Sequence, residues 1–440
     1  MIDLCGQKIT TGFGTMGNTK KVITIIAAII VFAAAAFVCY EVFIVKRGWV
    51  TTDEGTYYYD DYGKAYTGLS NMPDGTVRYF DPTTKLMLTG EVNIDGNNYL
   101  FDENGVMLYG LQKTGESMKY YDPQTGIRLS GWIESESGKY YFNEETGEEA
   151  LGLTVIDEKQ YYFDTESGLM KTGVFNIDGE EYCFDEITGI GIDGVFEMNG
   201  VKHAYLGGKM LKGVRIYADN HLYYLDETGT IVRDVDGNKP MVALTYDDGP
   251  SIYTDSILDT FEEYDQKCTF FIVGDRISWN EDQTRREAEL GCQQGNHTYG
   301  HNRLTDLNAE EMIEKLKGTD DELIRVTGQP STCLRPPEGR WNEELQSVCG
   351  CPIILWSVDS RDWESKDADK VCKTIIGKVK DGDIVLMHDL YKSTADATKR
   401  IVPALIEEGF QLVTVEEMGL VKTGGVGLED GVVYYSITGE

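Results

Sequence analysis

Two adjacent carboxylates at the end of an apolar segment are the strongest chemical signal in this sequence. An apolar run starting at Met241 leads into TYDDGP (245–250), which contains Asp247 and Asp248. The Gly-Pro pair that follows predicts a turn that ends a strand. Two like charges side by side repel each other, and a metal ion on one carboxylate leaves the other free as a base. The hexapeptide alone fits a polar turn equally well.

A histidine pair supplies further ligands. The chain has only five histidines, and two of them, His297 and His301, stand four residues apart in GNHTYGHNRL. Neutral imidazoles at this spacing can converge on one ion. Together with Asp248 they form a two-histidine, one-carboxylate set that leaves positions open for water and substrate. In a chain so poor in histidine, ligation is favoured over a polar surface pair.

Other polar residues end or follow apolar runs farther along the chain. His388 directly follows the apolar run in DIVLMHD, a position that suits a general acid near neutral pH, with a hydrogen-bonded buried histidine as the alternative. Arg335 in LRPPEG stands beside two prolines that stiffen the backbone and aim a fixed charge. VDSRDW (358–363) adds carboxylates and an aromatic side chain.

The elements that position these residues alternate between short apolar and longer amphipathic stretches after Asp234. The predicted strands are Met241–Tyr246, Thr269–Val273, Cys333–Arg335, Pro352–Val358, Asp383–Met387 and Gln411–Val415. The predicted helices are Asp255–Tyr264, Asp282–Leu290, Asn308–Thr327, Asn342–Val348, Ala368–Val379 and Ala395–Glu408. Such alternation favours a parallel α/β sheet, open or closed into a barrel, with its chemistry at the carboxyl ends of the strands.

The chain from about Pro240 to Leu420 resembles a polysaccharide deacetylase of carbohydrate esterase family 4. Five motifs of that family appear in order as TYDDGP, HTYGH, RPPEG, DSRDW and LMH. The resemblance implies a distorted (β/α) barrel and hydrolysis of N- or O-acetyl groups on glycans. It also implies a divalent metal, most commonly Zn²⁺, with Co²⁺ and Mn²⁺ as alternatives.

The resemblance assigns the metal and the base. Asp248, His297 and His301 would bind the metal, and Asp247 would be the general base for water activated by it. Arg335 would pair with Asp247 and lower its pKa, so that the carboxylate stays ionised.

The resemblance also assigns the acid and the substrate contacts. His388 would protonate the departing amine, held by Asp362. The backbone amide of Glu338 would stabilise the oxyanion. Trp363 and Leu386 would wall the acetyl pocket and the sugar groove.

Three residues depart from the family pattern. Gly300 stands where serine is usual, Asn302 where proline is common, and Glu338 where an aromatic or small residue is frequent. A carboxylate near the oxyanion could slow the reaction, so we expect these departures to affect substrate preference more than activity.

The segment from Gly48 to about Asp234 repeats itself. Its unit is a strand with two or three aromatics, an acidic turn and a short strand ending in Gly; YYF-like cores recur every 19 to 22 residues in about nine units. Asp95-Gly96 and Asn199-Gly200 favour tight hairpins. One hairpin cannot bury its aromatic face alone, so the pattern predicts a stacked all-β solenoid.

These repeats (48–234) resemble the cell-wall-binding, choline-binding-like repeats of Gram-positive surface proteins. The resemblance implies a wall or surface glycopolymer as partner. Choline cages need tryptophan together with tyrosines, and only Trp49 and Trp132 are present, so no choline site is assigned. The alternative is a spacer whose tyrosines only build the core. His203 and His221 are expected to be structural.

The N-terminal region carries an apolar stretch. Val22–Cys39 comprises eighteen residues without a charge, which is close to the length that spans a bilayer as a helix. It predicts a transmembrane signal-anchor over 22–45, with 1–21 in the cytoplasm and the rest outside. Cleavage after Ala33–Ala36, with secretion, is the alternative.

Charge and cysteine content narrow the function. The net charge of −34 argues against nucleic acid as partner, and residues 48–234 hold 33 acidic against 14 basic residues. The nine cysteines include no CxxC pair, so a zinc finger is not expected. Six of them fall within 268–372, where buried thiols are favoured and disulfides are the alternative.

Together these features predict a membrane-anchored extracellular enzyme that removes N-acetyl groups from peptidoglycan N-acetylglucosamine, similar to Gram-positive peptidoglycan deacetylases. One alternative is another acetylated glycan: xylan, chitin oligomers or an exopolysaccharide. The other is a wall-binding protein with an inactive esterase domain. The tail (421–440) echoes the repeat unit and could join either the solenoid or the barrel.

Overall fold

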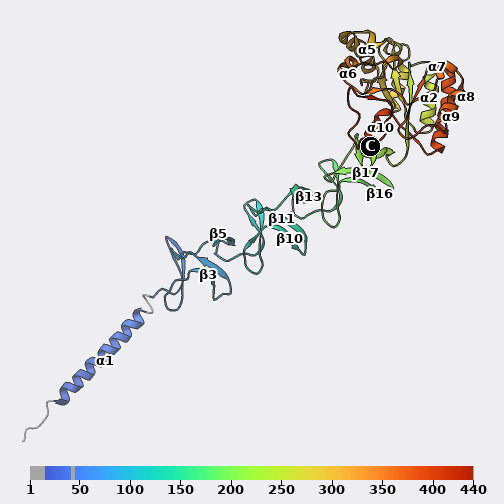
Figure 1. Ribbon diagram of the computed structural model, residues 1–440. Coiled ribbons are helices and arrows are strands. Elements are labelled where there is room, and N and C mark those ends of the chain that lie inside the picture. The colour runs from blue at the N-terminus through green and yellow to red at the C-terminus, as the bar shows by residue number, and fades with distance from the viewer. Residues whose placement is uncertain (1–14, 41–44, 440) are drawn as a thin grey trace, which may run out of the picture. The chain divides into compact units, whose positions relative to one another are not determined.

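The computed structural model describes residues 15–40 and 45–439, and Figure 1 shows its elements. The chain divides into a first unit, 1–172 with 186–189, and a second unit, 173–185 with 190–440. The predictions for residues 1–14, including Cys5 and most of the expected cytoplasmic segment, lie outside the described residues, as do those for 41–44.

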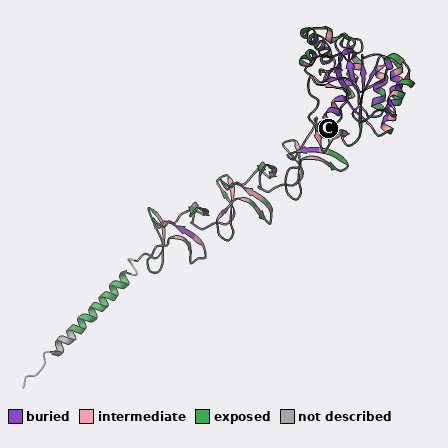
Figure 2. Ribbon diagram, in the orientation of Figure 1, coloured by how far each residue is buried: buried purple, intermediate pink, exposed green. Residues whose placement is uncertain are grey.

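The apolar N-terminal stretch is a helix, α1 (Thr15–Cys39). The side chains of its segment Val22–Cys39 are exposed along its whole length, as Figure 2 shows in green. At 1.5 Å per residue, eighteen residues extend about 27 Å, close to the thickness of a bilayer core. The helix is therefore long and apolar enough to cross a membrane, a test that signal sequences near an N-terminus also pass.

Nine antiparallel hairpins occupy the repeats, as their turn chemistry predicts. The first unit holds β1 (Gly48–Thr52), β2 (Gly55–Tyr59), β3 (Gly68–Asn71), β4 (Val77–Phe80), β5 (Gly90–Ile94), β6 (Asn97–Phe101), β7 (Gly110–Thr114), β8 (Ser117–Tyr121), β9 (Arg128–Leu129), β10 (Gly131–Ser135), β11 (Gly138–Phe142), β12 (Gly152–Ile156) and β13 (Lys159–Phe163). The second unit begins with β14 (Gly173–Ile177), β15 (Glu180–Phe184), β16 (Gly194–Met198), β17 (Val201–Leu206), β18 (Lys209–Met210), β19 (Arg215–Ala218), β20 (His221–Leu225) and β21 (Ile231–Asp236).

Each hairpin of the first unit is completed by its neighbours. The loop after β4 returns to the hairpin before it, where the Met87 N–H donates to the Thr56 carbonyl at 2.8 Å. The last residue of the second strand is an aromatic that is almost fully buried in five successive hairpins: Phe80, Phe101, Tyr121, Phe142 and Phe163. Stacking therefore buries what a single hairpin cannot, which confirms the predicted repeat architecture.

The rest of the second unit is built on parallel strands. A sheet of order β24-β23-β22-β27-β26, with β28 beside β22, has only parallel pairs. Its strands are β22 (Met241–Asp247), β23 (Thr269–Ile272), β24 (Gln293–Asn296), β26 (Val358–Asp359), β27 (Ile384–His388) and β28 (Gln411–Leu412). A bridge at Leu334 continues this order from β24 to β25 (Ile353–Ile354). The alternating strands and helices agree with the predicted distorted α/β barrel.

Helices cover these strands in two groups, within each of which neighbouring helices contact one another. One group consists of α2 (Thr254–Glu263), α7 (Asp362–Ser365), α8 (Ala368–Ile375) and α9 (Lys392–Glu407). The other consists of α3 (Gly274–Ile277), α4 (Glu281–Glu289), α5 (Ala309–Thr327) and α6 (Glu343–Val348). Helix α10 (Val415–Lys422) follows β28.

Three strand predictions were wrong in extent, and strand β24 was missed. Pro352–Val358 is not one strand, since β25 ends at Ile354 and β26 begins at Val358. Gln411–Val415 is a strand only at Gln411–Leu412, because Thr414 caps α10 and starts a helix at Val415. Cys333–Arg335 makes only the bridge at Leu334. The sequence QQGN of β24 has no apolar side chain, although all four residues are buried, so hydrophobic periodicity could not reveal it.

The last hairpin and the tail both pack on the parallel sheet. Leu222 and Val235 lie in one core with Met241 of β22, and Ile437 of the tail is buried in the same core. Strand β29 (Val433–Tyr434) pairs with β25. The tail, for which the sequence left two alternatives open, therefore completes the barrel.

The cysteines and the two repeat histidines have local, structural surroundings. The six cysteines between 268 and 372 are thiols, and the sulfurs of Cys268 and Cys292 lie 3.7 Å apart. His203 Nδ1 lies 2.9 Å from the carbonyl oxygen of Gly229, and His221 Nδ1 lies 2.6 Å from Asp234 Oδ1.

Candidate active site

Most of the residues singled out by the sequence meet at one pocket of about 410 Å³. Eight of the ten predicted site residues line it: Asp247, Asp248, His297, His301, Glu338, Trp363, Leu386 and His388. The other two, Arg335 and Asp362, are fully buried and contact residues of that lining. Because β22, β24 and β27 all end here, their carboxyl ends place the motifs together.

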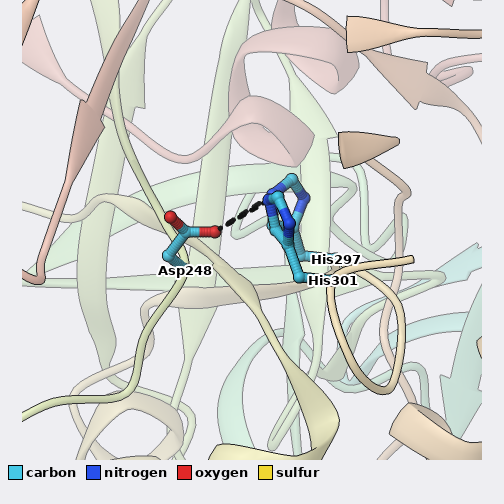
Figure 3. A group of neighbouring side chains, drawn as sticks. All are labelled: Asp248, His297 and His301. Atoms are coloured by element: carbon cyan, nitrogen blue, oxygen red, sulfur yellow. Dashed lines mark ion pairs between the residues drawn. The ribbon is translucent and has the colours of Figure 1, made fainter. Parts of the chain in front are cut away.

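Asp248 points at the two histidines, as Figure 3 shows. Its Oδ1 atom lies 3.5 Å from His297 Nε2 and 3.3 Å from His301 Nε2. The left-handed backbone of Asp248, with φ 74°, turns its side chain away from the direction of β22. One ligand atom from each of the three residues lies within 4.8 Å of the others, which fits a single metal ion.

Two further observations support a cation between these three residues. Asp248 Oδ1 is buried and has no hydrogen-bond partner among the described residues, so it is an orphaned acceptor. Burial raises the pKa of Asp248, but His297 and His301 outweigh burial and hold it well below its usual value. Burial and the neighbouring His297 lower the pKa of His301, which favours the neutral imidazole that a ligand requires.

A backbone carbonyl group fixes the orientation of the His297 ring. Its Nδ1 lies 2.6 Å from the carbonyl oxygen of Arg335, so the N–H belongs on Nδ1 and the lone pair of Nε2 faces Asp248. His301 sits on a tight loop in which the Asn302 N–H donates to the Thr298 hydroxyl at 2.8 Å. Its φ of 52° brings the ring back beside His297, at 5.1 Å between ring centroids.

Asp247 has a different partner from its neighbour. Its Oδ1 accepts a 2.7 Å hydrogen bond from Arg335 Nη1, while its Oδ2 lies 3.9 Å from His297 Nε2. The Arg335 guanidinium is fully buried and also donates to the Thr245 hydroxyl and to the carbonyls of Ile354 and Leu355. With its donors satisfied in this way, the guanidinium holds the Asp247 carboxylate in place beside Asp248 and His297.

His388 is held by a buried carboxylate on the other side of the pocket. Asp362 accepts from His388 Nδ1 at 2.8 Å through Oδ1, and from the His388 backbone N–H at 2.7 Å through Oδ2. The Thr394 hydroxyl donates to the same Oδ2. Burial lowers the pKa of His388, but the bond to Asp362 outweighs it and raises the pKa to about 9. The imidazole is therefore protonated near neutral pH, as a general acid requires.

The Glu338 carboxylate is engaged by two arginines. Arg303 Nε donates to its Oε1 at 2.8 Å, and Arg340 Nε lies 3.1 Å from its Oε2. Hydrogen bonding from Arg303 lowers the Glu338 pKa. The carboxylate expected at this position is therefore ion-paired on both of its oxygens.

The pocket also contains residues that the sequence analysis did not single out: Trp356, Asp359 and Tyr391. Asp359 belongs to the quoted segment VDSRDW, so its place at the end of β26 was a usable signal. Tyr391 follows His388 by three residues, and its ring centroid lies 6.2 Å from that of the imidazole. Trp356 precedes β26 in an apolar run, where nothing distinguishes it from a core residue.

Sequence comparisons agree with this geometry. The sequence profile described as Polysaccharide deacetylase matches residues 234–350, and the profile described as Choline-binding repeat matches residues 88–131. A peptidoglycan-N-acetylglucosamine deacetylase of Bacillus cereus is 30% identical over 203 residues, which cover 44% of this chain and 95% of that protein. The chain belongs to the polysaccharide deacetylase family.

Two longer relatives share only this region. Peptidoglycan-N-acetylmuramic acid deacetylase PdaC of Bacillus subtilis is 35% identical over 189 residues, 43% of this chain and 40% of the relative. Its solved structure, also 35% identical, covers 43% of this chain and 94% of the solved chain with a TM-score of 0.42. Peptidoglycan-N-acetylglucosamine deacetylase PgdA of Listeria monocytogenes is 38% identical over 178 residues, 40% of this chain and 38% of the relative. The chain thus spans about two fifths of these two relatives.

Proposed function

We propose that the protein is a metal-dependent deacetylase that hydrolyses N-acetyl groups of N-acetylglucosamine in peptidoglycan. The observation that carries the proposal is the convergence on one pocket of three metal-ligand side chains, the Asp247–Arg335 pair and the Asp362–His388 pair. The names of the relatives, which are peptidoglycan deacetylases, support the substrate class.

Each residue has one task in this proposal. Asp248, His297 and His301 hold the ion, which we propose to be Zn²⁺. When bound, a divalent cation makes water more acidic and polarises a carbonyl group.

The remaining steps belong to protein groups alone. Asp247 accepts the proton of the attacking water while Arg335 keeps the carboxylate in place. The Glu338 amide donates a hydrogen bond to the oxyanion. His388 gives its proton to the departing nitrogen, and Asp362 stabilises the imidazolium. Leu386 and Trp363 border the acetyl group and the sugar.

The test is release of acetate from purified peptidoglycan by the full-length chain, with and without a chelator. We expect the chelator to abolish release and Asp247→Asn to lower kcat by about 10²- to 10⁴-fold, the range for loss of a general base. Asp282→Asn, which removes an exposed carboxylate on α4, is the control. Undiminished release by Asp247→Asn would contradict the proposal. Acetylated xylan, chitin oligomers and exopolysaccharide serve as competing substrates.

We further propose that the repeats bind a wall glycopolymer at Trp132. This half-exposed indole borders a pocket of about 260 Å³ together with Tyr161, Glu134 and Lys139. The rings of Trp132 and Tyr161 are in edge-to-face contact at 5.0 Å between centroids. An exposed aromatic face flanked by one carboxylate and one ammonium group suits a polar polymer with apolar ring faces.

The equivalent place in the first hairpin holds a charged side chain. Trp49 occupies the position of Trp132 in its hairpin, and Arg78 occupies that of Tyr161. The Arg78 guanidinium lies 4.9 Å from the centroid of the Trp49 ring and is ion-paired to Asp74. The Trp132 site differs because an uncharged tyrosine stands where this arginine does.

Co-sedimentation of the full-length chain with purified walls tests this site. We expect Trp132→Ala to weaken binding by about 2- to 30-fold, which corresponds to roughly 0.5–2 kcal/mol for contacts to one aromatic face. Tyr62→Ala, which removes a fully exposed aromatic side chain of the same unit, is the control. Equal binding by wild type and Trp132→Ala would reject the site.

The apolar helix α1 and the wall-enzyme relatives fit an extracellular location. We propose that α1 stays in the membrane as an anchor and that the repeats and the deacetylase lie outside.

A further inference from the structure

The carboxylate of Glu338 is occupied on both of its oxygens. Arg303 approaches Oε1 with Nε at 2.8 Å and with Nη2 at 2.6 Å, and Arg340 Nε lies 3.1 Å from Oε2. A carboxylate bound by two guanidinium groups has a defined orientation, since each contact restrains a different direction.

The backbone of Glu338 is itself restrained. Its φ of 59° and ψ of 13° fall in the left-handed region, which residues with a side chain rarely adopt unless their surroundings impose it. Before it, Pro337 has a fixed φ. After it, Gly339 lies against the Trp356 ring so closely that a Cβ there would be 2.9 Å from a ring carbon. The two arginines add a restraint through the side chain.

Arg303 connects this turn to the metal-ligand loop. It stands two residues after His301, and both His301 and Glu338 border the pocket. The contact between Arg303 and Glu338 therefore joins the segment that carries a proposed metal ligand to the segment that carries the proposed oxyanion donor.

We propose that Arg303 and Arg340 act through the Glu338 carboxylate as positioning residues that fix the direction of the Glu338 amide and its separation from His301. This inference rests on the proposed function. In this inference the Glu338 side chain positions the Glu338 backbone amide, and the backbone amide contacts the substrate.

The experiment compares kcat and KM of the full-length chain and its variants on solubilised peptidoglycan fragments. Arg303→Met should lower kcat by about three- to tenfold with KM within about twofold, since a misplaced donor weakens the transition state more than the bound substrate. Arg303→Lys, which keeps the charge, should recover part of the loss. Raising salt should lower the kcat of the wild type toward that of Arg303→Met and leave the variant unchanged, because exposed ion pairs are screened.

Arg325→Met is the matched control, since Arg325 also bridges two carboxylates, of Glu281 and Glu322, each at 2.7 Å, on the distant helix α5. Its kcat should equal that of the wild type. Equal kcat in wild type and Arg303→Met, or an equal loss in Arg325→Met, overturns the positioning role alone. Absence of acetate release by the wild type rejects the proposed function, and this inference with it.

Discussion

At the scale of single residues, two adjacent aspartates have opposite surroundings because their backbones differ. Asp247 ends β22 with its carboxylate on buried Arg335, whereas the left-handed Asp248 turns its carboxylate toward His297. The sequence predicted which residues would meet, since motif order and strand ends are visible in it. It could not show that the Glu338 carboxylate is paired with Arg303, because that contact joins two irregular loops.

Metal binding should appear as stability as well as activity. Adding Zn²⁺ to the chelator-treated protein at about 100 times its Kd should stabilise it by roughly 2.7 kcal/mol, or about 5–10 °C in Tm. Asp248→Asn should lose most of this increase, because the orphaned carboxylate oxygen is the charged ligand. Thermal melts with and without Zn²⁺ measure the effect, with Asp282→Asn as control. An equal increase in wild type and Asp248→Asn would refute the ligand assignment.

The pH dependence of catalysis should report the Asp362–His388 pair. The acid must be protonated, so activity is present below the His388 pKa of about 9 and is lost as pH rises through it. The Asp362→Asn variant lacks the carboxylate that raises the His388 pKa, while burial of the imidazole still lowers that pKa. The alkaline limb of kcat/KM should therefore move to lower pH by about one to three units.

Thr394→Val is the control for this shift, because it removes a hydrogen bond to Asp362 but leaves the carboxylate charge. It should move the limb much less. An unchanged alkaline limb in Asp362→Asn would show that another group is the acid.

At the scale of elements, strand β21 is bound to helix α10 by a largely buried ion pair. Arg233 donates from Nε at 2.6 Å and from Nη2 at 3.0 Å to Glu417, whose side chain is only 3% exposed. Glu417 also accepts the Thr414 N–H at 2.9 Å in the capping box of α10. The last repeat hairpin therefore contributes to the stability of the second unit.

Arg233→Met should destabilise the second unit by about 3 kcal/mol, because it leaves a buried carboxylate without its partner. The expected fall in Tm is about 6–12 °C. Arg215→Met removes a neighbouring but exposed pair with Glu416 and should cost less than about 1 kcal/mol. Calorimetry of the two full-length variants measures the difference. Equal Tm values for both would show that the contact of β21 with α10 carries no stability.

The predicted limits of helices and strands were most accurate where the sequence pattern was long and regular. Helix α5 begins at a capping box on Asn308 and ends before Gly328, so its limits were readable from the sequence. The aromatic periodicity likewise predicted the hairpins. Strand β24 was not predicted because its side chains are polar, and the hydrogen bonds that allow their burial come from distant parts of the sequence. Gln293 donates to the Thr332 hydroxyl, and Asn296 donates to the carbonyl of Leu316.

At the scale of the whole molecule, an acidic chain combines an apolar helix, a repeat array and an enzyme domain. The net charge of −34 keeps the chain from binding anionic polymers nonspecifically. The same negative charge attracts cationic groups. Removal of acetyl groups from amino sugars produces such groups.

The anchor can be tested by fractionating cells. We expect the full-length chain in the membrane fraction, and the double variant Ile29→Lys, Ile30→Lys outside it, because each charge at a helix centre costs about 2.5–3.5 kcal/mol of insertion. Val155→Lys, an exposed apolar residue of the repeats, is the control. A mature protein whose mass lacks the residues up to Ala36 would show cleavage and contradict the anchor.

The residue pairs at the junctions between hairpins differ from one junction to another. At three junctions the second residue of one hairpin meets the third-from-last residue of the next: Trp49 with Arg78, Glu91 with Lys119, and Trp132 with Tyr161. Arginine, lysine and tyrosine all occur at the second position of these pairs, while the aromatic that ends the same strand stays buried in each hairpin: Phe80, Tyr121 and Phe163. A single substitution on either side of a junction therefore changes the chemistry of the pair. Natural selection can therefore redistribute binding sites along the array while its length and fold stay the same.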